Sequence, residues 1–71
     1  MNNFEKLLRA NGINKTKFGI MIGVKGSTIP KYIVNPKLLR VEQVLRLANT
    51  MNISCGELIR VINGQAKMGI L

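Results

Sequence analysis

Residues that interrupt helices are spaced closely along this chain, and this spacing limits it to short elements. Asn11-Gly12, Gly23, Asn35-Pro36 and Asn63-Gly64 separate short segments whose apolar residues recur at helical spacing. No useful length of β-strand alternation is present. A chain of 71 residues can bury only a small core, which short local elements supply economically. The sequence therefore predicts one compact all-α domain of five helices.

Capping residues define the second helix most clearly. Asn14 is a favourable N-cap for a helix over residues 15–22, and Ile13 and Phe18 are spaced to pack across its first turn. Gly23 should end it. The positions expected to face the core in the other helices are Phe4, Leu7 and Leu8; Val24, Ile29, Tyr32 and Ile33; Val41, Val44, Leu45, Ala48 and Met51; and Leu58, Ile59 and Ile62.

The C-terminal part of the chain divides into a fifth helix and a short tail. Ser54 and Glu57 have the spacing of a capping box, which begins the fifth helix. We therefore assign residues 1–63 to the domain and residues 64–71 to a tail. The apolar side chains of this tail permit two interpretations, a frayed end or a contact that forms a dimer.

Basic residues outnumber acidic residues by 11 to 3, which gives a net charge of +8. Polyanions are the partners that such a surface favours, although a basic segment alone is as often a solvated face. No carboxylate lies between Glu5 and Glu42. We expect Lys6, Arg9, Arg46 and Arg60 to lie on solvated helix faces.

Residue types needed for catalysis or metal binding are almost missing from the sequence. It has no His and no Asp, and each Glu falls in the first turn of an expected helix, where the helix dipole favours it. Cys55 is the only cysteine, so it has neither a disulfide partner nor a histidine base. We expect no enzyme activity, no metal and no cofactor, and a reducing, cytoplasmic setting. No segment approaches the ~20 apolar residues of a membrane span, so a membrane partner is not expected.

Residues 14–32 have the pattern of a helix-turn-helix, with two short helices joined by a turn that contains glycine. Gly19 is expected to face the following helix at close range, where a larger side chain would separate the two. Gly23 is expected to adopt a positive φ in the turn.

In this register the sequence resembles the lambdoid Cro and repressor type of helix-turn-helix domain, the Xre/Cro family. The similarity covers Phe4 to about Ile62 and is greatest in GINKTKFGIMIGV at residues 12–24, followed by Ser27-Thr28-Ile29. VLRLA at 44–48 and MNIS at 51–54 resemble the fourth helix of the family and the turn after it. The resemblance implies a lambda-repressor-like bundle from a prokaryotic cell or phage-infected host, with the third helix in the DNA major groove.

The resemblance also implies which residues contact DNA. Lys15 would touch a phosphate, the residues around the start of the third helix would face the bases, and Lys37 and Arg40 would hold the backbone further along. The complete expected set is Lys15, Lys17, Lys25, Gly26, Ser27, Thr28, Lys31, Lys37 and Arg40.

The sequence departs from the family pattern at the third helix and its partner. The family often pairs an Arg in the first helix with a Glu at the end of the third, and Leu8 and Ile33 take these places. A joint replacement by apolar residues is compatible with the fold. Pro30 would disrupt the middle of a helix, so we predict that the third helix begins late, near Ser27 or Thr28, and is short.

Two functions follow from this reading. The first is a sequence-specific, duplex DNA-binding transcriptional regulator of Cro/repressor type that binds as a homodimer. The alternative is an antirepressor or modulator on the same scaffold, which acts by binding a phage repressor protein. Pro30 and Gly26 motivate the alternative, because both reduce the side chains available to read bases.

Overall fold

Five α-helices and one 3-10 helix form the structure, a computed structural model that describes residues 2–64. No strand occurs in this part of the chain, so the all-α prediction is confirmed for it. The predicted tail, apart from Gly64, lies outside the described residues. The helices are α1 (Asn3–Ala10), α2 (Lys15–Ile22), α3 (Thr28–Val34), the 3-10 helix η1 (Pro36–Leu38), α4 (Val41–Met51) and α5 (Cys55–Ile62).

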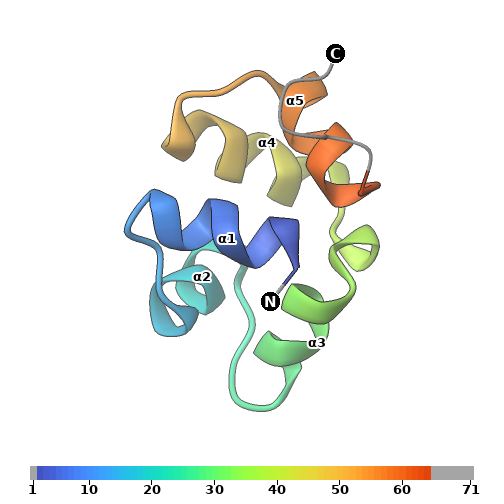
Figure 1. Ribbon diagram of the computed structural model, residues 1–71. Helices are drawn as coiled ribbons and strands as arrows, with labels where there is room; N and C mark the ends of the chain where they lie inside the picture. Colours follow the sequence, from blue (N-terminus) through green and yellow to red (C-terminus); the bar gives the residue numbers. More distant parts are fainter. Residues whose placement is uncertain (1, 65–71) are drawn as a thin grey trace.

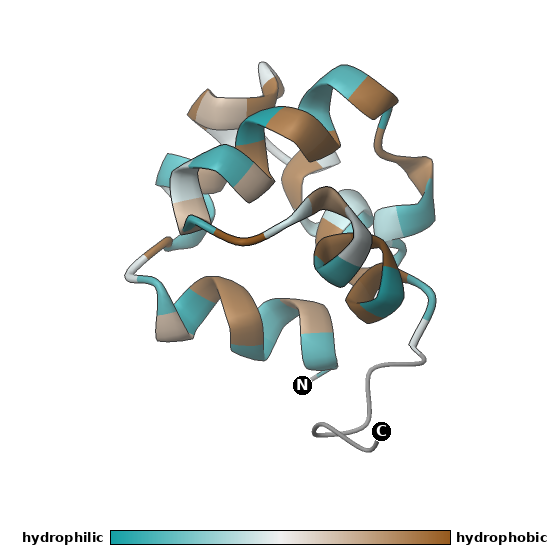
Figure 2. Cartoon of the chain, turned by 90° about the horizontal axis from the view of Figure 1, so that it is seen from above, coloured by the Kyte–Doolittle hydropathy of each residue, from teal (hydrophilic) through white to brown (hydrophobic). Residues whose placement is uncertain are grey.

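The helices surround one apolar core. In Figure 1, α1 lies in the middle of the molecule, with α4 and α5 on one side of it and α2 and α3 on the other. Hydrophobic and hydrophilic stretches alternate along the helices (Figure 2), so each helix contributes one apolar side. The rings of Phe4 and Phe18 meet edge to face at the centre, 5.7 Å apart. The core comprises Phe4, Leu8, Ile13, Phe18, Ile22, Ile33, Leu47, Ala48, Met51 and Leu58.

Side-chain caps begin three of the helices. The Asn14 Oδ1 accepts the backbone N–H of Lys17 at 2.8 Å, which confirms the predicted start of α2. Ser54 and Glu57 form the predicted capping box of α5, each accepting the other's backbone N–H at 3.1 Å. Asn2 caps α1 in the same way, although the sequence analysis did not identify it.

The start of α3 agrees with the prediction that Pro30 falls in a first turn. The helix begins at Thr28, directly after Ser27. Ser27 itself has a helical backbone and its side chain makes no capping hydrogen bond. The backbone N–H groups of Thr28 and Ile29 instead donate to the carbonyl oxygens of Lys25 and Gly26, at 3.3 and 3.1 Å. The prediction of a late, short helix is confirmed, whereas η1 was not predicted.

The inward orientation predicted for Val41, Leu45 and Ile59 is wrong. These side chains are 76%, 51% and 46% exposed. The side of α4 that faces the core is made by Leu47, Ala48 and Met51, with half-buried Val44. The apolar band on α4 is therefore wider than the strip that the small core covers, and its outer edge stays exposed.

Candidate nucleic-acid interface

The packing of α3 against α2 depends on Gly19. A Cβ atom at this position would lie 2.5 Å from the Ile29 Cδ1 and 3.0 Å from the Val24 carbonyl oxygen. Gly23 ends α2 with a φ of 77°, and its N–H donates to the Gly19 carbonyl at 2.8 Å. Both glycine predictions are confirmed, and together these residues fix where α3 starts relative to α2.

Two side chains of α4 hold the C-terminal end of α2. The Gln43 Nε2 donates to the Ile22 carbonyl at 2.9 Å, and the Arg46 Nη1 donates to the Met21 carbonyl at 3.1 Å. These carbonyls belong to the last turn of α2, where helix acceptors lack partners within the helix. Gln43 also accepts the Arg40 backbone N–H at 2.7 Å, so one side chain positions both α2 and the start of α4.

The other end of the α2–α3 unit is held by Asn2. Its Nδ2 donates to the Ile33 carbonyl at 2.8 Å, while its Oδ1 accepts the Glu5 N–H at 2.7 Å. This single side chain therefore joins the end of α3 to the start of α1. Gln43 and Arg46 attach α2 to α4, and Asn2 attaches α3 to α1. The orientation of the α2–α3 pair therefore depends on helices outside it.

Most of the residues predicted to bind DNA are exposed, and Thr28 alone is half-buried. None of them forms an ion pair, because the only one within residues 2–64 joins Arg9 and Glu5 at 3.6 Å. Their charged side chains are therefore not held in ion pairs, whereas the backbone N–H groups of Lys17, Thr28 and Arg40 already donate to Asn14, Lys25 and Gln43. Lys15 and Lys17 lie in the first turn of α2, Lys25 and Gly26 in the connection, Ser27 and Thr28 at the start of α3, Lys31 within α3, Lys37 in η1 and Arg40 just before α4.

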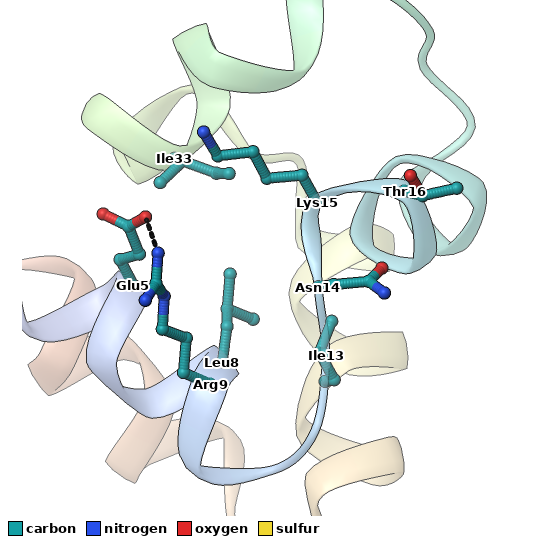
Figure 3. A pocket seen from close by; sticks show the side chains of 8 residues that line it. All are labelled: Glu5, Leu8, Arg9, Ile13, Asn14, Lys15, Thr16 and Ile33. Carbon is teal, nitrogen blue, oxygen red and sulfur yellow. Dashed lines mark ion pairs between the residues drawn. The ribbon is translucent and has the colours of Figure 1, made fainter.

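These residues do not form a single patch. Ser27 and Lys31 are four positions apart, so they share one side of α3. Lys15 and Lys17 are two positions apart on α2 and therefore point to different sides of it. Figure 3 shows the Lys15 side chain extended across a hollow toward Ile33.

This hollow, of about 370 Å³, lies between α1 and the start of α2. Leu8 and Ile33 line it and are both buried. Glu5 and Arg9 pair with each other at its edge (Figure 3). The Arg9 charge is thereby partly neutralised, unlike the charges of the predicted contact residues.

Gly26 contributes backbone rather than a side chain. It is exposed with a φ of 61°, and an added Cβ would meet no atom within 4 Å. The conformation, and not a lack of space, therefore requires glycine here. Gly26 can therefore offer a ligand only its backbone groups, and its carbonyl already accepts the Ile29 N–H at 3.1 Å.

Two further features are absent from the part of the chain that the structure describes. Residues 2–64 bring together no three His, Cys, Asp or Glu side chains that could hold a metal. None of the helices described is both long and apolar enough to cross a membrane. Comparisons with protein-family models, with curated proteins and with solved structures give no match.

Proposed function

We propose that the protein is a sequence-specific transcriptional regulator that binds duplex DNA, with α2 and α3 acting as a helix-turn-helix. One observation carries the proposal. Every Lys and Arg from Lys15 to Arg40 is exposed and free of ion pairs within the described chain, and residues 15–40 contain no carboxylate. Such a run of free cations over α2, α3 and η1 favours a polyanionic partner such as nucleic acid, even though Lys15 and Lys17 point to different sides of α2.

The dimensions of α3 suit the major groove. An α-helix with its side chains is about 10–12 Å in diameter, which matches a major groove about 12 Å wide, so the exposed side of α3 can enter it. Ser27 and Lys31 lie on its exposed side, where a hydroxyl and an ammonium can reach base edges. Lys37 and Arg40 follow in η1 and before α4, where they can contact phosphates without reading sequence.

The test is a fluorescence-anisotropy titration of labelled duplex DNA between about 50 and 200 mM salt, after selection of preferred sequences from a random pool. The proposal expects binding that weakens steeply with salt, together with an enriched sequence. Failure to bind at the lowest salt would reject it.

Lys→Gln variants that each remove one positive charge distinguish phosphate contacts from base contacts. Lys37→Gln should weaken binding to all sequences alike and reduce the slope of log affinity against log salt by about one. Lys31→Gln should in addition change the selected sequence. Lys6→Gln, which removes an equal charge from the exposed side of α1, should leave the selected sequence unchanged and affect affinity least.

A second candidate, a modulator that binds a repressor protein, is favoured by the apolar character of the exposed side of α3. Pro30 is exposed there and Val34 is 76% exposed, while Gly26 presents no side chain. This candidate predicts that no DNA sequence is enriched, that Ser27→Ala and Lys31→Ala have no effect on DNA affinity, and that the protein binds a purified phage repressor.

A further inference from the structure

The exposed side of α3 carries two apolar side chains beside its polar ones. Exposed residues recur along this helix at intervals of three or four positions, and they are Ser27, Pro30, Lys31 and Val34. This spacing places them above one another as one stripe. The side that faces the core is made by Ile29, Tyr32 and Ile33. The helix therefore presents a single outward stripe, and Val34 within it is 76% exposed.

Val34 lies in the middle of this stripe. Successive residues of an α-helix are about 100° apart around its axis. In this projection Pro30 and Lys31 stand at the two edges of the stripe, with Ser27 and Val34 between them. Pro30 and Val34 are four positions apart, so they form a continuous apolar strip beside the Ser27 hydroxyl and the Lys31 ammonium. A partner that covers the middle of the stripe must therefore contact Val34.

The major groove of a duplex contains one apolar group that matches such a strip. Its base edges carry hydrogen-bond donors and acceptors, and the C5-methyl group of thymine is the exception. An apolar side chain pressed against a donor or acceptor would leave that group without a partner, which costs binding free energy. 5-Methylcytosine carries the same methyl group at the same ring position. An apolar strip in the groove therefore favours a pyrimidine that carries a C5-methyl group.

The surroundings of the strip favour a duplex over an apolar protein surface. Lys25 and Lys31 are exposed close to it, and residues 15–40 contain no carboxylate. Neither lysine forms an ion pair within residues 2–64. A protein that covered the strip with apolar side chains would also remove these charges from water without a partner, which is costly. A duplex instead offers them phosphates and base acceptors.

We propose that Val34, with Pro30 beside it, contacts the C5-methyl group of a pyrimidine in the major groove and so selects thymine or 5-methylcytosine at this place. This contact rests on the proposed function and names a base that α3 recognises. Val34 lies three residues after Lys31, about 4.5 Å along the helix axis. Because neighbouring base pairs are about 3.4 Å apart, the methylated pyrimidine should lie within two base pairs of the base that Lys31 contacts.

The test changes single bases of the selected sequence, thymine to uracil and cytosine to 5-methylcytosine, which alters only the methyl group. Anisotropy titrations of the full chain should show, at one position, that the methyl group raises affinity by about four- to tenfold. This ratio should not change with salt, because an apolar contact releases no counterions. Whichever of thymine and 5-methylcytosine binds more tightly there is the natural base. Affinity that no methyl group changes at any position overturns the proposal.

Val34→Ala identifies the side chain that makes the contact. It keeps the net charge at an exposed position, and circular dichroism checks the fold. The affinity ratio between the duplexes with and without the methyl group should fall below about twofold. Ile20→Ala is the matched control, because Ile20 is 75% exposed but lies on α2, and it should keep the wild-type ratio. A ratio that survives in Val34→Ala, or falls equally in both variants, overturns the proposal.

The methyl contact and the DNA-binding function fail in different ways. A chain that binds no duplex at the lowest salt refutes both. Sequence-selective binding that is indifferent to the methyl group refutes the contact and leaves the DNA-binding function in place. If Val34→Ala weakens binding to a purified phage repressor and leaves DNA affinity unchanged, the strip binds protein, and the methyl contact is wrong.

Discussion

Gly19 and Gly56 show how the same residue type serves different purposes at different positions. Both lie within helices and neither has a positive φ. A Cβ at Gly19 would collide with Ile29, whereas a Cβ at Gly56 would only touch the Ser54 Oγ at 3.9 Å. The first glycine is required by packing, and the second is not.

Gly19→Ala is therefore expected to destabilise the protein by about 1–3 kcal/mol, because α3 must move away from α2 or Ile29 must leave its position. Gly56→Ala should leave stability unchanged or raise it by up to about 1 kcal/mol, since alanine favours the helix. Urea denaturation of both variants measures the difference. Equal effects from the two substitutions would contradict the close packing of α2 and α3.

The contact with Ile29 can be tested separately. Ile29→Val removes the Cδ1 atom that a Cβ at position 19 would approach most closely. The double variant Gly19→Ala/Ile29→Val should be more stable than the sum of the single effects predicts, by at least about 0.5 kcal/mol. Strict additivity would mean that the Val24 carbonyl, and not Ile29, limits the space at Gly19.

At the scale of elements, the hydrogen bonds of Gln43 determine how α4 holds α2. Gln43→Ala removes the donor to the Ile22 carbonyl and the acceptor of the Arg40 N–H, and should cost about 1–2 kcal/mol in unfolding free energy. Gln43→Glu keeps the acceptor but places a carboxylate against the Ile22 carbonyl, so it should not restore stability. Asn49→Ala, at an exposed position of the same helix, should change stability by less than about 0.5 kcal/mol.

The helix boundaries could be predicted from the sequence because the signals for them are local. Asn14, Gly23 and the Ser54–Glu57 pair act within one or two turns of where they stand. The outward orientation of Val41 and Leu45 could not be predicted, since helical spacing identifies an apolar band but not how much of it the neighbours cover. It depends on where η1 and α5 lie.

At the predicted site, too, local features could be predicted from the sequence and long-range contacts could not. The four-residue spacing of Ser27 and Lys31 places them on one side of α3, and that side is exposed. The hydrogen bonds of Asn2, Gln43 and Arg46 join residues more than 20 positions apart, so local patterns carry no sign of them. The Gln at the third position of α4 was the one available signal, and it indicated only the bond to the Arg40 amide.

At the scale of the whole molecule, the excess of positive charge should make stability depend on salt. Eleven cations against three anions repel one another in the folded state, and salt screens this repulsion. Unfolding free energy in urea should rise by about 1 kcal/mol between low and moderate sodium chloride. Lys25→Gln should reduce the salt effect, whereas Arg9→Gln should reduce it less, since Arg9 is already paired with Glu5. Stability that is constant or falls with salt would contradict this prediction.

The two ends of the described chain, Asn2 and Gly64, line the same hollow. A short linker could therefore close the backbone into a ring, and the exposed Asn11-Gly12 turn offers a place to reopen it with little loss of contacts. In such a circular permutant α1 would become the last helix to emerge from the ribosome. The central helix would then complete the core last instead of being made first, while the order of the other helices and the architecture are retained.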